Sequence, residues 1–275
     1  MSVAFSADLE FVWGFQARAA GLSKTSPSFY YPPPTTLLGA LAESIARKVG
    51  AGESAGREMI TALSRNVLAV GIRPINCVPL KYEDINKIIA VKWTSGVLHP
   101  SPGDLAGSYD SPARGKTVMM SLDDSSPALR IIVVLKKDEI ELRGRKVRIE
   151  EDHLWGIHRL GSKESRISVV DVKRQDAKAE EGRTTSKCSF PVMEGIKLLE
   201  ELQRKWLYEV YVNPREVSYG REGSPALMYI EGRSLIPFRI PIMVTRAGQP
   251  EFAVEVKSPA AFYRVGEDVV IGWKA

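Results

Sequence analysis

The residues best suited to binding chemistry lie in a short basic segment, RLGSKESR at positions 159–166. Gly161 and Ser162 have small side chains, so the backbone there can approach a phosphate group closely. The flanking cations can neutralise the phosphate charge; they are Arg159, Lys163 and Arg166. The segment therefore predicts a phosphate-binding loop. The alternative interpretation is a solvated turn between a helix and a strand.

A second candidate surface surrounds the aromatic and proline-rich segment FYYPPPTT at positions 29–36. Exposed tyrosines can stack on nucleobases, and a helix that begins at Thr35 would attract an anion at its N-terminus. The candidate RNA-binding residues of this region are Arg18, Lys24, Tyr30, Tyr31 and Thr35. Alternatively, the aromatic side chains pack beneath the prolines as part of the core.

A third candidate surface is a long segment, about 94–116, that is rich in glycine and proline. An irregular stretch of this length inside a compact domain is typically functional or mobile. Cations with interleaved aromatic residues suit a single nucleic-acid strand, and those in and beside this segment are Lys92, Arg114 and Lys116, with Trp93 and Tyr109. The alternative is an ordered loop anchored by Trp93.

The sequence contains little that points to catalysis. His99 lies in the third candidate segment and could act as a general acid or base in RNA cleavage. His153 and His158 are five residues apart, which separates them on a helix and disfavours a shared metal ion. No motif of a serine hydrolase, a zinc protease or a P-loop enzyme is present. We therefore expect no catalytic residue, no metal site and no cofactor.

Composition and charge set the class of protein. The chain has 275 residues, of which 44% are hydrophobic and 26% charged, as is ordinary for a soluble globular protein. Its net charge of +5 fits a polyanionic partner without establishing one. It has no long apolar run and no signal-peptide pattern, so we expect a cytoplasmic protein with reduced cysteines.

The elements that must position these residues follow from hydrophobic periodicity. Residues 3–11 alternate as a strand with one buried face, and a threonine-capped helix follows the prolines. We expect further helices at 53–66, 150–158 and 192–205; strands at 67–75, 118–122, 129–135 and 167–172; an apolar run at 85–93; a segment at 140–149 that completes a hairpin with 129–135 by turning at 136–139; and a mobile loop at 175–189.

This order of elements predicts an α+β protein. Residues 1–175 match a β-α-β-β-α-β ferredoxin-like unit with a long insertion at about 88–120. Residues 176–275 would form a loop, a helix and a smaller β-rich C-terminal lobe. A ferredoxin-like sheet has one face covered by helices and one open face, and the open face often receives RNA.

Three segments also resemble a known family. The segment FYYPPPTTLLGAL at 29–41 resembles the N-terminal hallmark of the CRISPR-associated Cas5 family, in which a first strand runs into P-P-x-T-L-L-G at the head of the first helix. The segment RLGSKES at 159–165 is similar to the family's G-x-K-E segment. The segment YDSPARGKT at 109–117 is similar to the insertion of archaeal subtype I-A members.

The resemblance implies a fold and a role. The fold would be that of the RAMP superfamily, an RNA-recognition-like ferredoxin core with a thumb at about 88–120. The protein would be a non-catalytic subunit of a type I, I-A-like Cascade complex in antiviral defence. It would hold the 5′ handle of the CRISPR RNA, cap a filament of Cas seven backbone subunits and touch the Cascade large subunit. It would meet target DNA only indirectly and would bind no membrane.

Two alternatives stay open. One is a metal-independent endoribonuclease that processes CRISPR repeat RNA, with His99 or His158 as acid or base, because one subtype uses its Cas5 protein in this way. The other is a β-rich assembly protein whose basic charge is incidental.

Overall fold

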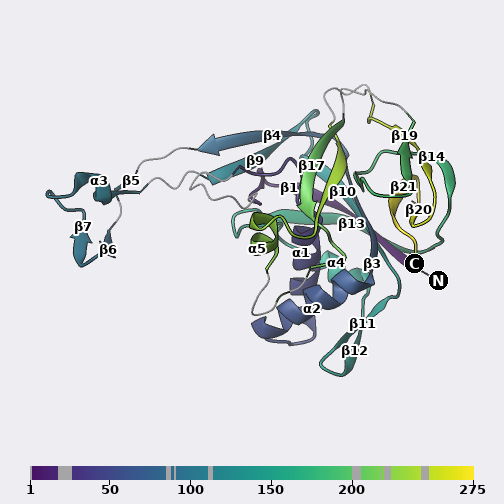
Figure 1. Ribbon diagram of the computed structural model, residues 1–275, viewed down its shortest axis with the longest axis horizontal. Helices are drawn as coiled ribbons and strands as arrows, with labels where there is room; N and C mark the ends of the chain where they lie inside the picture. Colours follow the sequence, from purple (N-terminus) through teal and green to yellow (C-terminus); the bar gives the residue numbers. More distant parts are fainter. Residues whose placement is uncertain are drawn as a thin grey trace.

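A four-stranded antiparallel sheet forms the centre of the molecule (Figure 1). The computed structural model of the chain describes residues 2–17, 27–84, 88–89, 91–110, 114–199, 206–217, 219, 224–242 and 248–275. The strand order is β13–β1–β10–β3, and all three neighbouring pairs are antiparallel. These strands are β1 (Ser2–Phe11), β3 (Val67–Pro74), β10 (Ala128–Leu135) and β13 (Ile167–Ala177).

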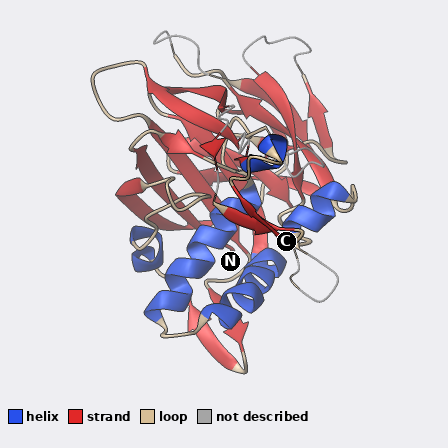
Figure 2. Cartoon of the chain, turned by 90° about the vertical axis from the view of Figure 1, so that its left-hand side faces the viewer, coloured by secondary structure: helices blue, strands red, loops and turns tan. Residues whose placement is uncertain are grey.

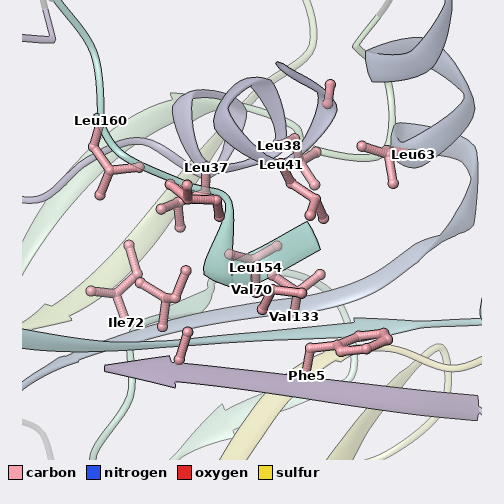
Figure 3. Packing of buried hydrophobic residues seen from close by; sticks show 14 of the residues in the cluster. Phe5, Leu37, Leu38, Leu41, Leu63, Val70, Ile72, Val133, Leu154 and Leu160 are labelled. Atoms are coloured by element: carbon pink, nitrogen blue, oxygen red, sulfur yellow. The ribbon is translucent and has the colours of Figure 1, made fainter. Parts of the chain in front are cut away.

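Helices cover one face of this sheet. They are α1 (Pro34–Lys48), α2 (Glu53–Asn66) and α4 (Glu151–Trp155), and Figure 2 shows them gathered on one side of the strands. The predicted alternation of the first strand is confirmed, because Phe5 and its same-face neighbours are buried in one cluster with leucines of the helices (Figure 3). Burial of this apolar face is the main contribution to the stability of the layer.

The start of α1 differs from the prediction. Pro33 is the N-cap residue, and no side chain caps the helix. Pro34 occupies the first helical position, where its missing N–H group costs nothing and its fixed φ suits a helix. The prediction that threonine caps this helix is therefore wrong, and Thr35 and Thr36 lie within its first turn.

The second face of the sheet is covered over β3 and β10 but not over β13, where Ser168 and Lys173 are exposed, so the predicted open face is only partly present. The hairpin of β20 (Ala260–Val265) and β21 (Asp268–Trp273) packs on it. The approach is so close that a Cβ atom added to Gly272 would lie 2.2 Å from the Leu68 carbonyl oxygen. The hairpin therefore leaves the covered part of this face inaccessible to a ligand.

An ion-pair network lies beside the hairpin on this second face. Arg73 is 5% exposed, and its Nε lies 2.6 Å from Oδ1 of Asp268, which is 3% exposed. Arg130 bridges to Asp8 on β1 at 2.6 Å and to Asp268 at 3.3 Å. The hydrogen bonds and charge of Asp8 hold the pKa of Arg130 above its usual value. The network ties the C-terminal hairpin to the central sheet.

The rest of the C-terminal region is made of small sheets and one short helix. The expected helix at 192–205 is wrong over 192–199, because Ile196–Leu198 pairs as a strand with β19, and 200–205 lie outside the described residues. The expected loop at 175–189 is also wrong, because β13 runs to Ala177 and β14 pairs with β19. The remaining elements are β14 (Gly182–Ser186), β15 (Phe190–Pro191), β16 (Ile196–Leu198), β17 (Trp206–Val212), α5 (Pro225–Ile230), β18 (Leu235–Pro241) and β19 (Phe252–Val256).

A long arm extends from the body, on the left of Figure 1. Its stem is an antiparallel ribbon of β4 and β9, and β2 joins the ribbon at its base. The predicted irregular segment at 94–116 contains regular elements in its described part. The elements of the arm and its base are β2 (Gly14–Phe15), β4 (Cys77–Asp84), β5 (Ile88–Ile89), β6 (Lys92–Thr94), β7 (Val97–His99), α3 (Leu105–Ser108), β8 (Tyr109–Asp110) and β9 (Arg114–Ser121).

A second hairpin, of β11 (Glu139–Leu142) and β12 (Arg145–Arg148), projects beside α2 (Figure 1). It turns at Arg143 and Gly144, both with positive φ. The predicted hairpin between 129–135 and 140–149 is therefore wrong, because β11 pairs with β12 and β10 pairs with β1 and β3. Both cysteines are buried and free, as expected. Among the described residues, no helix is both long and apolar enough to cross a membrane.

Candidate nucleic-acid interface

A groove follows the exposed side of α1. Two adjoining pockets of about 310 and 180 Å³ share Thr35, Thr36, Gly161 and Pro225. A third pocket, of about 560 Å³, continues between α1 and α2. We call these three connected pockets the α1 groove. We call the pocket of about 310 Å³, the larger of the first pair, the larger pocket. It is also lined by Gly39, Ala40, Glu43, Arg159 and Tyr219.

The predicted phosphate-binding segment, residues 159–166, forms one edge of the α1 groove; we call it the basic loop. It is closed on itself, because the Leu160 N–H donates to the Ser165 carbonyl at 3.0 Å. The loop is also fixed to Gln16, the residue that directly follows β2. The Gln16 N–H donates to Ser165 Oγ at 2.9 Å, and the Ser162 N–H donates to the Gln16 carbonyl at 3.1 Å. The loop is therefore held in place by contacts within the protein.

Gly161 has a structural reason to be glycine. Its φ is +96°, and an added Cβ atom would lie 2.4 Å from the Gln16 carbonyl oxygen. Any larger residue would strain the backbone and push the loop away from Gln16. Gly161 lines the α1 groove, so this close approach also sets the shape of the groove.

The cations of the basic loop face solvent. Arg159, Lys163 and Arg166 are all exposed, and Arg159 lines the larger pocket. Lys163 is 84% exposed at its side chain and pairs with Glu164 only at 3.9 Å. Such an exposed pair contributes little energy, so these cations remain available to an anionic ligand.

The end of α4 fixes the start of the basic loop on α1. An added Cβ atom at Gly156 would lie 2.2 Å from Ser44 Oγ, so the two helices meet through small residues. This approach lets Arg47 donate to the Gly156 carbonyl and lie 3.4 Å from His158 Nδ1. The groove is thus built by packing that is independent of any ligand.

The two predicted tyrosines differ in their placement. Tyr31 is fully buried and donates its hydroxyl to the Pro241 carbonyl at 2.7 Å, and burial raises its pKa. The prediction that Tyr31 stacks on RNA is therefore wrong, because its ring belongs to the core. Tyr30 is half-buried, and Lys81 Nζ lies 3.8 Å from its ring centroid. Glu209 anchors both, accepting from the Tyr30 N–H at 2.8 Å and from Lys81 Nζ at 2.9 Å.

The structure does not bring all the predicted site residues together. Thr35, Arg159 and Gly161 line one pocket, and Ser162, Lys163 and Arg166 belong to the same loop. Lys92 and Lys116 lie on the arm, in β6 and β9. Arg18, Lys24 and the side chain of Arg114 lie outside the described residues.

Sequence reasoning missed Glu43 and Tyr219, which line the larger pocket. Glu43 lies four residues after Gly39 and eight after Thr35, so helical spacing alone could have placed it on the same side of α1. Tyr219 comes from a distant C-terminal segment, and no local pattern connects it to α1.

The three histidines lie in three different environments. His99 is 3% exposed inside the arm, with Nδ1 3.4 Å from Ser108 Oγ. His153 accepts from the Glu150 N–H at 3.0 Å, and burial is the main cause that lowers its pKa. This confirms the helix-end packing expected for His153. His158 alone borders the groove, with Nδ1 3.8 Å from Glu43 Oε2. In the described part of the chain, no three potential metal ligands cluster.

Comparisons with known proteins cover nearly the whole chain. No family model matches it. It is 27% identical over 269 residues to a Saccharolobus solfataricus protein named CRISPR system aCascade subunit Cas5 1, covering 96% of each chain. A second protein of that organism, CRISPR-associated protein Cas5 3, is 26% identical over 96% of each chain. The crystal structure of a CRISPR protein from Archaeoglobus fulgidus matches with a TM-score of 0.72 and 44% identity, over 99% of this chain and 100% of that one.

Proposed function

Because the chain belongs to the Cas5 family of CRISPR-associated proteins, we propose that it is a subunit of an archaeal, I-A-like Cascade complex. We propose that it holds the 5′ handle of the CRISPR RNA in the α1 groove and caps one end of the backbone filament. The relatives named as Cas5 proteins, one of them as an aCascade subunit, support the first part. The α1 groove is the observation that carries handle binding, and the exposed apolar residues of the arm support a contact with the backbone filament.

We infer that the central sheet is the ferredoxin-like core of a RAMP protein. Four strands and the helices between them follow one another as β1, α1–α2, β3, β10, α4 and β13, and the strand order β13–β1–β10–β3 is the one such a unit requires. We assign this core to residues 1–175, the thumb to about 88–120 and the C-terminal lobe to 176–275. Since that lobe covers β3 and β10 on the second sheet face, and the exposed cations of the basic loop lie at the α1 groove, we place the RNA beside α1.

Two properties of the α1 groove support RNA binding: its positive charge, and a loop backbone that is ordered before any ligand binds. The basic loop presents three exposed cations beside the N-terminus of α1, which carries a partial positive charge. Its backbone is fixed to Gln16 without a ligand, so binding would not have to order it. A handle held for the lifetime of a complex gains most from such pre-arranged contacts.

We propose that the arm is the thumb and that it contacts the neighbouring backbone subunit and the guide. Large apolar side chains on the arm face solvent: Val91 is 84% exposed, Trp93 69% and Leu105 64%. Apolar residues gathered in this way typically mark a protein interface. Lys92 and Lys116 lie on the same arm and could contact the RNA backbone.

We propose that the protein binds RNA without cutting it. His99 is buried in the arm, away from the α1 groove. His158 keeps the endoribonuclease alternative testable, because it borders the groove beside Glu43. Specific cleavage of CRISPR repeat RNA in EDTA, lost in a His158→Ala variant, would establish the alternative and overturn the binding role.

Co-purification tests the proposal. The chain is expressed with a CRISPR array and the other Cascade subunits, and the RNA bound to it is sequenced. The proposal predicts protected fragments whose 5′ ends carry the handle. Recovery of guide fragments that lack the handle, or of no RNA, would contradict it.

A further inference from the structure

A carboxylate stands inside the otherwise basic α1 groove. Glu43 lines the larger pocket together with Arg159. Its side chain is 38% exposed, and its one ion-pair contact in the described chain is with His158 at 3.8 Å. No described lysine or arginine therefore neutralises it at close range.

Such a carboxylate does not suit a surface that only tracks phosphates. A negative charge near the RNA backbone repels it, and a carboxylate accepts hydrogen bonds but donates none. It becomes useful where a ligand presents N–H groups. In single-stranded RNA, those groups lie on the edges of splayed-out bases.

Resting on the proposed RNA-binding function, we propose that the pocket of about 310 Å³ in the α1 groove takes one unstacked guanine and that Glu43 selects it. Guanine is the base whose pairing edge carries two adjacent donors, N1–H and the 2-amino group, which match the two oxygens of a carboxylate. The pairing edges of adenine, cytosine and uracil each offer one donor position with an acceptor beside it, so they would leave an oxygen facing an acceptor.

The walls of the pocket fit one nucleotide. Its volume of about 310 Å³ lies at the low end of small-ligand sites, which span roughly 300–1,000 Å³. Tyr219 offers an aromatic wall for stacking. Gly39 lines the same pocket and has no side chain to fill it. Arg159 can hold the phosphate of the same nucleotide.

Selection from random RNA tests this inference. A pool of short single-stranded RNAs of random sequence is passed over the wild-type protein, Glu43→Ala and Glu43→Gln, and the bound RNA is sequenced. The matched control is Glu141→Ala, an exposed glutamate on the β11–β12 hairpin. Wild type and control should enrich guanine at one position about 5- to 100-fold. Both Glu43 variants should still retain RNA but lose the enrichment.

Three results would overturn the inference. Retained RNA without a guanine preference, or with a preference that survives in Glu43→Ala, would remove the guanine pocket and leave the proposed function intact. A uniform gain in affinity for all sequences in both variants would show that Glu43 only repels phosphates. Failure of the wild type to retain any RNA would overturn the proposed function together with the pocket.

Discussion

In the α1 groove, the backbone of the basic loop is held by contacts within the protein, whereas on the arm large apolar side chains face solvent. Gly161 and Ser165 of the basic loop are fixed to Gln16 by backbone contacts and hydrogen bonds. Trp93, by contrast, is 69% exposed, and β6 pairs only with β7 among the described residues. The backbone of the basic loop is thus ordered without a ligand, while the arm keeps an apolar surface exposed.

The difference follows from the packing beneath each region. The body buries one face of its sheet under the helices and part of the other under the β20–β21 hairpin. The stem of the arm is a two-stranded ribbon for most of its length, and a ribbon alone buries little apolar surface. Substitutions should therefore separate stability, RNA binding and partner binding into different parts of the molecule.

The largest effect is expected on the free energy of unfolding, from a substitution in the body of the molecule. Asp268→Ala leaves Arg73 and Arg130 without their buried carboxylate partner, and we expect it to lower the free energy of unfolding by about 3–5 kcal/mol. The matched control is Asp171→Ala, which removes an exposed pair with Lys173 and should cost less than about 1 kcal/mol. Chemical denaturation measures both. Equal costs for the two variants would contradict the structural role assigned to Asp268.

The next effect is expected in RNA binding. Lys163→Glu combined with Arg166→Glu should weaken binding of handle RNA by about 1–3 kcal/mol, because charged contacts to phosphate are lost. The slope of log affinity against log salt should fall by roughly 1–2. Fluorescence anisotropy measures both quantities.

The control for this pair is Arg145→Glu with Lys146→Glu, which makes the same charge change on the exposed β12 strand. A loss of affinity as large in the control would mean that net charge, and not the basic loop, governs binding.

A smaller effect is expected on the arm. Trp93→Ala should change the free energy of unfolding by less than about 0.5 kcal/mol, since the side chain is mostly exposed. It should nevertheless weaken binding to the backbone subunit by about 2 kcal/mol. Calorimetry of the subunit pair measures this, with Trp155→Ala on α4 as the tryptophan control. Normal partner binding by Trp93→Ala would remove Trp93 from the interface.

The smallest effect concerns pH. The folded state holds the pKa of His153 below its ordinary value of about 6.5, mainly through burial. The unfolded chain therefore binds a proton more readily, so stability should be complete above that value and should fall as the pH drops below it. Protonation also places a hydrogen on the Nδ1 atom that accepts from the Glu150 N–H. Thermal unfolding across this range should show the loss, and His153→Gln should abolish it; an unchanged profile in His153→Gln would contradict this assignment.

The sequence predicted the elements that are determined by local patterns of apolar residues. The alternation of β1 and the spacing of Leu37, Leu38, Leu41 and Ile45 in α1 are both confirmed. Errors arose where a distant partner decided the structure. Ile196–Leu198 carries apolar residues that also suit a helix, but β19 from much later in the chain pairs with it.

The candidate site was predictable in part. Small residues and cations marked the basic loop, and the proline-rich segment marked the start of α1. That Thr35, Arg159 and Gly161 line one pocket depends on the contact between Gln16 and Gly161, which lie far apart in the sequence. The burial of Tyr31 likewise depends on Pro241 in β18, and no local pattern reveals that contact.

Photo-crosslinking tests directly whether the handle RNA binds in the α1 groove. Handle RNA carrying a photoreactive uridine at successive positions is bound to the protein, irradiated, and the crosslinked peptides are identified by mass spectrometry. If the handle RNA lies in the α1 groove, crosslinks should form in the basic loop, residues 159–166, and in the first half of α1. Crosslinks confined to the β11–β12 hairpin or to the β20–β21 hairpin would contradict this placement.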